Sequence, residues 1–136
     1  MIVRYNSQLA HSVAFKFIMN GFSELLNAGH TVDKLIFDNK SQVVFVVDDY
    51  NVIMGASVFC VTAEKEGLIQ FSYVDPKFRK QGVYKLMYSN IETRCKTQNA
   101  VILLSFVWSN NIAMLNAAQT LGRVITSVRV AKSLVD

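Results

Sequence analysis

Between residues 68 and 108, the pattern of apolar residues changes from extended to helical and back to extended. An apolar run at residues 68–74 is followed by five apolar residues on one helical stripe: Val83, Leu86, Met87, Ile91 and Cys95. Residues 100–108 then form an apolar run that includes one serine, which is typical of a strand covered on both faces. A strand, a helix and a second strand in this order predict two parallel strands joined by a right-handed crossover.

Extended segments also precede this unit. Val43–Val47 and Val52–Val61 are rich in β-branched and aromatic residues, and a turn at residues 49–51 separates them. A second turn, at residues 65–67, leads into the strand Leu68–Val74. Short turns between extended runs predict an antiparallel meander.

The N-terminal part combines a strand with helices. Met1–Arg4 is predicted as a short strand, and Ser7 as the N-cap of an amphipathic helix. Asn20-Gly21 is expected to interrupt this helix, and a shorter second helix is expected to end at Gly29.

The C-terminal part is expected to hold one helix and one strand. Ser109 or Asn110 is placed as the cap of a helix over residues 112–121, and Val124–Leu134 as a final strand. The whole chain, residues 1–136, then reads as a single α/β (α+β) domain with a mixed central sheet. The predicted element order is β-α-α-β-β-β-α-β-α-β.

Composition limits the class of protein. Hydrophobic residues make up 51% and charged residues 18%, which suits one packed core. The longest apolar run, residues 52–63, is far shorter than the roughly 20 residues that cross a bilayer. The start of the chain has no signal-peptide pattern, and the two cysteines form neither a disulfide framework nor a zinc motif. We therefore expect a cytoplasmic protein without a metal.

Charge is divided unevenly along the chain. Residues 1–76 hold five basic and eight acidic residues, whereas residues 77–136 hold nine basic and two acidic residues. The balance thus changes from −3 to +7 just after Pro76, the only proline. A basic C-terminal part suggests an anionic partner, although basic residues can also serve solubility alone.

Residues 74–84, Val-Asp-Pro-Lys-Phe-Arg-Lys-Gln-Gly-Val-Tyr, join the predicted strand to the predicted helix. Gly82 stands at the start of the helix, where the absence of a Cβ allows a ligand to approach closely. The first N–H groups of a helix lack internal partners and can bind an anion. Lys77, Arg79 and Lys80 add positive charge, so the segment suits a phosphate or pyrophosphate, or else is a solvated basic loop.

This segment resembles the pyrophosphate loop of the GNAT superfamily of acyl-CoA-dependent N-acetyltransferases. That loop reads Arg/Gln-x-x-Gly-x-Gly/Ala and often follows Val-x-Pro. Here Val74-Asp75-Pro76 is followed by Arg79-Lys80-Gln81-Gly82-Val83-Tyr84. A second family signature, an Asn and then a helix that ends in Leu-Gly, corresponds to Asn110-Asn111 and Leu121-Gly122.

The resemblance implies acetyl-CoA as co-substrate, held where the two central parallel strands splay apart. Its pantetheine arm would lie along the backbone of Ser72, Tyr73 and Val74, and its pyrophosphate on residues 79–84. Asn111 would reach the pantetheine side near Met114. The cofactor-binding residues implied are therefore Ser72, Tyr73, Val74, Arg79, Lys80, Gln81, Gly82, Val83, Tyr84, Asn111 and Met114.

The catalytic positions depart from the family pattern. Gln70 stands where many members have a glutamate base, and Ala118 where many have a tyrosine that protonates the leaving thiolate. Ser72 and Tyr73 flank the expected site and are the candidate catalytic residues, and three others could approach it: Glu66, Asp48 and His30. Alternatively, the reaction needs little acid–base help, because a thiol with a pKa near 8.5 is a fair leaving group.

The expected reaction is transfer of an acetyl group to a primary amine of a small molecule or a protein. The acidic balance of residues 1–76 favours a cationic acceptor. The alternative is a non-catalytic module of the same fold that binds acyl-CoA or a protein partner. The basic part lacks an aromatic and basic strand platform, which argues against a nucleic-acid partner. Only 14 residues follow Gly122, which leaves room for one long strand or two very short ones, so we expect the acceptor site to be either open or completed by a second subunit.

Overall fold

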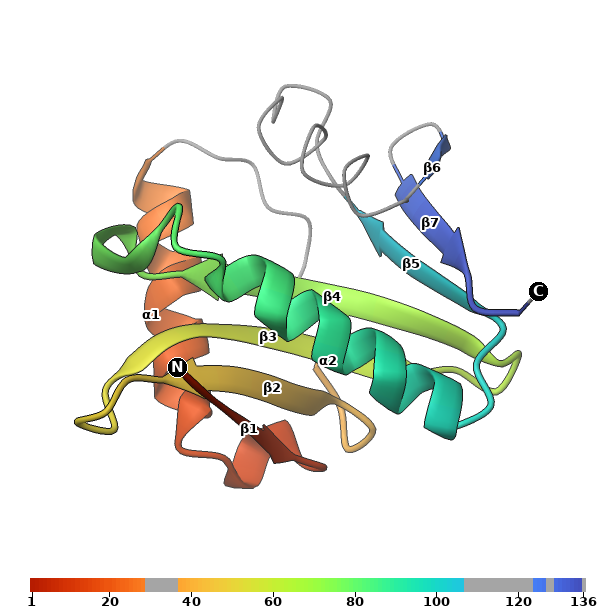
Figure 1. Cartoon of the computed structure of the whole chain (residues 1–136), viewed down its shortest axis with the longest axis horizontal. Coiled ribbons are helices and arrows are strands. Elements are labelled where there is room, and N and C mark those ends of the chain that lie inside the picture. The colour runs from red at the N-terminus through yellow and green to blue at the C-terminus, as the bar shows by residue number, and fades with distance from the viewer. Residues whose placement is uncertain (29–36, 107–123, 127–128, 136) are drawn as a thin grey trace.

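A computed structural model describes residues 1–28, 37–106, 124–126 and 129–135. Seven strands form one sheet in the order β1-β2-β3-β4-β5-β7-β6 (Figure 1). The strands are β1 (Ile2–Asn6), β2 (Gln42–Val47), β3 (Ile53–Val61), β4 (Glu66–Val74), β5 (Ile102–Phe106), β6 (Val124–Thr126) and β7 (Arg129–Ser133). The helical elements are η1 (Leu9–His11), α1 (Ala14–Asn27), η2 (Pro76–Phe78) and α2 (Val83–Thr97).

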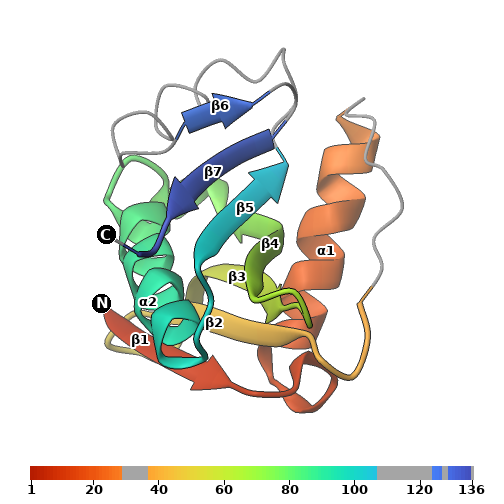
Figure 2. The ribbon, with the colours of Figure 1, turned by 90° about the vertical axis from the view of Figure 1, so that its right-hand side faces the viewer.

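The mixed α/β architecture that the sequence predicts is confirmed. Neighbouring strands from β1 to β4 pair antiparallel, β4 and β5 pair parallel, and β7 pairs antiparallel with both β5 and β6. The helices α1 and α2 lie on opposite faces of the sheet (Figure 2). The helix α2 connects the parallel pair, as the apolar pattern of residues 68–108 predicts.

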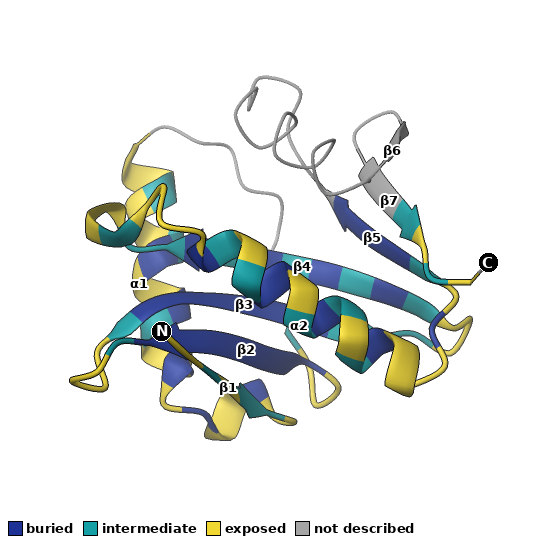
Figure 3. Ribbon diagram, viewed as in Figure 1, coloured by how far each residue is buried: buried dark blue, intermediate teal, exposed yellow. Residues whose placement is uncertain are grey.

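Each face of the sheet has its own apolar core, and the strands β2 and β3 between them are mostly buried (Figure 3). Strand alternation sends Val44 and Val46 toward α2, where they join Met87 and Ile91 in one buried cluster. The residues between them face α1, where Val43 and Phe45 pack with Ala14 and Ile18. The strand β2 is therefore buried along its whole length.

A β-bulge reverses this alternation within β4. Val58 pairs with Phe71 whereas Phe59 pairs with Ile69, so Gln70 is an extra residue without a counterpart in β3. Ile69 consequently packs in the α2-side core, and Phe71 packs in the α1-side core. The bulge thus sets which side chains of β4 face each helix beyond residue 70.

The first predicted helix boundaries are wrong. Ser7 caps no helix, because a 3₁₀ turn intervenes and α1 begins at Ala14, whose N–H donates to Ser12 Oγ at 3.1 Å. The helix also runs unbroken through Asn20-Gly21, since its buried face, which includes Ala14, Ile18 and Gly21, continues across them. Gly29, the predicted end, lies outside the described residues.

Two further predictions are corrected. Glu66 and Gly67 are not a turn but the first residues of β4, paired with β5. Residues 124–134 are not one strand: β6 and β7 pair with each other, so the chain reverses direction within this segment. The predicted helix over residues 112–121 lies outside the described residues.

Candidate active site

The strands β4 and β5 pair only at one end. Their parallel pairing runs from Glu66 with Ile102 to Ile69 with Ser105 and then stops. Beyond Ile69, β4 continues to Val74 with pairing to β3 only, among the described residues. The two strands diverge from this point (Figure 1). The family resemblance implies splayed strands that hold a pantetheine arm, and here the two strands form a fork that closes at Ile69 and Ser105.

The open end of the fork leads into the loop of residues 75–82. Asp75 donates its N–H to the Met54 carbonyl at 2.9 Å, which ties the start of the loop to β3. Its carboxylate accepts the Lys77 N–H at 2.9 Å, and Pro76 begins the short η2 turn. Aspartate before proline therefore builds a compact turn at the point where β4 ends.

Gly82 ends the loop in a left-handed conformation, with φ of +85°. A Cβ at this position would meet nothing within 4 Å, so the space above the glycine is open. Gly82 offers no side-chain cap to α2, and the first helical bond in this turn is from Leu86 N–H to its carbonyl at 3.0 Å. The helix therefore begins at this glycine, and the first N–H groups of a helix have no acceptor in the preceding turn, as an anion site requires.

Positive charge surrounds this helix terminus. Four cationic residues in the loop and first turn of α2 are exposed: Lys77, Arg79, Lys80 and Lys85. Arg79 also has a structural role, because its Nε donates to the Val74 carbonyl at 3.0 Å. Its guanidinium lies 5.7 Å from the centroid of the Tyr73 ring. Arg79 therefore fixes the exit of β4 beside the phosphate-type loop.

Val83 and Tyr84 differ in their surroundings. Val83 is buried in the α2-side core, so it can offer only its backbone N–H to a ligand. Tyr84 is half-buried and stacks on Tyr88 at 6.3 Å between ring centroids. Tyr84 stands where the family has Gly or Ala, and its side chain lies on the helix rather than inside the loop.

Ser72 and Tyr73, the candidate catalytic residues, face opposite sides of the sheet. Ser72 lies on the α2 side, and its Oγ is 2.6 Å from Ser57 Oγ on β3. Tyr73 lies on the α1 side in the core with Ala14 and Ile18, and is 7% exposed. Ser72 and Tyr73 therefore cannot both act on a substrate bound at one face of the sheet.

Tyr73 has a partner that the sequence does not reveal. Its hydroxyl donates to the carboxylate of Glu24 on α1. Burial and this hydrogen bond raise the pKa of Tyr73 to about 12. Gly21 makes the arrangement possible, because a Cβ on it would lie 2.5 Å from Cγ of the Tyr73 ring. In the sequence, this contact between Tyr73 and α1 is indicated only by the spacing of Gly21 and Glu24, which puts both on one helix face.

The other candidate acid–base residues are spread over the molecule. Gln70 accepts a hydrogen bond from Ser41 Oγ at 3.0 Å, so the bulge is tied to the chain before β2. Glu66 begins β4, about 25 Å along the strand from Val74. The carboxylate of Asp48 accepts the N–H groups of Tyr50 and Val52 in the β2–β3 turn. His30, Asn111, Met114 and Ala118 lie outside the described residues.

The splayed strands and the loop before α2 are found together in a known protein family. The model of the acetyltransferase (GNAT) family matches residues 15–122. The chain belongs to this family. Comparison with curated protein sequences found no match.

Solved structures share the fold of this GNAT chain. The protein yncA from Salmonella typhimurium, solved with its cofactor acetyl-CoA, has a TM-score of 0.76 at 14% identity, covering 100% of this chain and 95% of its own. A GNAT acetyltransferase from Staphylococcus aureus has a TM-score of 0.75 at 12% identity, covering 98% and 100%. An IAA acetyltransferase from Bacillus cereus has a TM-score of 0.72 at 12% identity, covering 97% and 98%.

Two negative findings hold for the residues that the structure describes. No helix in this part of the chain is long and apolar enough to cross a membrane. No group of three or more His, Cys, Asp and Glu residues gathers there as a metal site would require.

Proposed function

We propose that this GNAT chain transfers an acetyl group from acetyl-CoA to a primary amine. The observation that carries the proposal is the fork between β4 and β5, which opens onto the uncapped N-terminus of α2. A molecule with a polyanionic end and a long, narrow arm suits both parts at once. The acetyl-CoA complex of the structural neighbour yncA supports the same assignment.

The loop would hold the pyrophosphate of acetyl-CoA. The backbone N–H groups of residues 79–84 and the cations Lys77, Lys80 and Lys85 are the groups that would bind it. The open space above Gly82 lets phosphate oxygens approach the backbone. The pantetheine amides would bond to the backbone of β4 between Ser72 and Val74, and Asn111 and Met114 would complete the site.

Acetyl-CoA supplies the activated acyl group, and the chain would bind and orient it. Backbone N–H groups of β4 beside the bulge would polarise the thioester carbonyl. Neither Ser72 nor Tyr73 is positioned as a strong base. Ser72 is bonded to Ser57, and the raised pKa of Tyr73 keeps its hydroxyl protonated at neutral pH. We therefore expect a reaction that speeds up with pH as the acceptor amine loses its proton.

Release of the CoA thiol tests the proposal. The purified chain is incubated with acetyl-CoA and a panel of amines, and free thiol is measured against a reaction without amine. Amine-dependent thiol release, with an acetylated product by mass spectrometry, is the expected result. Binding of acetyl-CoA without any release would instead favour the non-catalytic module of this fold.

The acceptor panel should include cationic, neutral and acidic amines. Glu24 and the acidic balance of residues 1–76 favour a cationic acceptor. Faster release with diamines or lysine-like amines than with neutral amines is expected. Release with acidic amines alone would contradict this choice of acceptor.

A further inference from the structure

Ser105 lies where the fork closes. It is the last residue of β5 that pairs with β4, opposite Ile69. The side chain is almost fully buried, with an exposure of 5%. Leu103, two residues earlier on β5, belongs to the α2-side core, so strand alternation places Ser105 on the α2 side as well.

Its hydroxyl is buried without a hydrogen bond to the described part of the chain. A buried polar atom without a partner is unfavourable and uncommon in folded proteins. Three other buried serines, Ser12, Ser41 and Ser57, each have a hydrogen-bond partner in the same structure. Ser105 is therefore a polar group that a ligand could satisfy.

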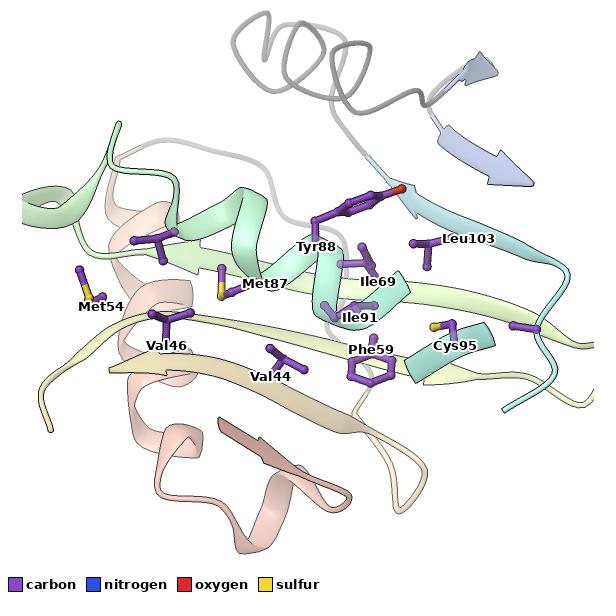
Figure 4. Close-up of a cluster of buried hydrophobic side chains, with 12 residues drawn as sticks. Val44, Val46, Met54, Phe59, Ile69, Met87, Tyr88, Ile91, Cys95 and Leu103 are labelled. Carbon is purple, nitrogen blue, oxygen red and sulfur yellow. The ribbon is translucent and has the colours of Figure 1, made fainter. Parts of the chain in front are cut away.

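Two aromatic residues of α2 lie on the face of the sheet that Ser105 shares. Tyr88, 2% exposed, extends from α2 toward β5 (Figure 4). Its ring stacks on Tyr84, one turn earlier and next to the start of the helix. The two rings thus extend from the phosphate-type loop toward the closed end of the fork, on the face that Ser105 shares.

We propose that the Ser105 hydroxyl donates a hydrogen bond to the sulfur of acetyl-CoA and to the CoA thiolate that leaves. This inference rests on the proposed function. With the pyrophosphate on the loop, the arm would run back along β4 from Val74 to Ile69, about 17 Å of extended strand. An extended pantetheine arm can bridge that distance and ends in sulfur. Ser105 would replace the hydroxyl that is missing at Ala118.

The reaction step is balanced without another reagent. The amine nitrogen attacks the thioester carbonyl carbon, and the C–S bond breaks with its electron pair going to sulfur. The amine releases its proton to water, and the thiolate takes a proton from water. Ser105 keeps its own proton and only stabilises the charge that develops on sulfur.

Binding measurements on two variants test this role. Ser105→Ala removes the hydroxyl, and Ser105→Thr keeps it. Each variant and the wild type are titrated calorimetrically with acetyl-CoA, CoA and adenosine 3′,5′-bisphosphate. We expect Ser105→Ala to bind acetyl-CoA and CoA about three- to tenfold more weakly, with unchanged affinity for the bisphosphate, which has no sulfur. Ser105→Thr should recover most of the affinity.

Thermal stability of the unliganded chain gives a second readout. Ser105→Ala removes a buried polar atom that has no hydrogen-bond partner among the described residues, so its melting temperature should equal or exceed that of the wild type. Ser57→Ala is the matched control: it removes a buried serine that has a partner, and should lower the melting temperature. Ser89→Ala, at an exposed position of α2, should change neither binding nor stability.

Several outcomes would overturn the inference. They are equal affinity of Ser105→Ala and wild type for acetyl-CoA, an equal loss for all three ligands, and a lower melting temperature of the unliganded Ser105→Ala chain. In each case wild-type binding of acetyl-CoA leaves the proposed function intact. If the wild type binds no acetyl-CoA, the proposed function itself fails, and the inference fails with it.

Discussion

At the scale of single residues, one glycine and one tyrosine determine how α1 meets β4. The Tyr73 ring occupies the place that a side chain at position 21 would fill. Its hydroxyl then reaches Glu24, one turn further along the helix. Sequence patterns predict the helix but not this contact. Asn-Gly is a common turn signal, and only the tertiary contact explains why the glycine lies inside a helix.

Replacing Gly21 tests this contact. Ala is the better helix former by about 1 kcal/mol, yet its Cβ would overlap the Tyr73 ring. We expect Gly21→Ala to lower the free energy of unfolding by about 1–3 kcal/mol, measured by urea denaturation. In a Tyr73→Ala background the same change should become stabilising. A Gly21→Ala chain as stable as the wild type would show that the ring moves aside freely.

The raised pKa of Tyr73 predicts a loss of stability at high pH. Its folded pKa, about 12, exceeds the ordinary value near 10, so the folded chain holds the phenolic proton more tightly than the unfolded chain. The resulting stabilisation is complete below about pH 10 and disappears as pH rises toward 12. Between pH 8 and 12, the free energy of unfolding should fall less steeply with pH for Tyr73→Phe than for the wild type. An equal dependence of the free energy of unfolding on pH in the two chains would contradict the raised pKa of Tyr73.

At the scale of elements, apolar periodicity predicts much of the fold. The pattern of residues 68–108 correctly gives β4, α2 and β5, their parallel pairing and the position of the loop between them. The bulge at Gln70 is not predictable, because it depends on how β4 registers against β3. The reversal between β6 and β7 is missed for a related reason: alternation in residues 124–134 is the same for one strand or two.

The candidate site also has parts that the sequence predicts and parts that it does not. Motif spacing predicts the loop, and the family resemblance implies the splayed strands. Motif spacing predicts neither the Glu24 contact nor the burial of Ser105, since both depend on which side chains the fold brings together. Ser72 and Tyr73 are neighbours in sequence, but strand alternation places them on opposite faces.

Substitutions of Gly82 test the conformation of the loop. Its φ of +85° disfavours side chains, although the space around it is open. Gly82→Ala should therefore destabilise the chain by about 1–2 kcal/mol through backbone strain alone. Gly82→Asn should cost less, because asparagine tolerates the left-handed region. Both variants should bind acetyl-CoA more weakly than the wild type, by calorimetry. Full stability of Gly82→Ala would contradict the left-handed turn.

At the scale of the whole molecule, the structure shows where the uneven charge of the chain lies. The change from −3 to +7 falls at Pro76, where β4 ends and the loop begins. The exposed cations of the loop lie at the N-terminal end of α2. A separate depression of about 350 Å³, lined by Tyr5, Ser7, Lys40, Gln42, Val61 and Gln98, includes a residue just past the other end of the helix. The depression is therefore separate from the fork.

A crystal structure of the chain with acetyl-CoA tests the central claim most directly. We expect the pyrophosphate on the N–H groups of residues 79–84, the pantetheine arm between β4 and β5, and the sulfur within hydrogen-bond distance of Ser105 Oγ. Acetyl-CoA bound in the depression beside Tyr5 and Gln42, or a fork that stays empty at saturating ligand, would contradict the account.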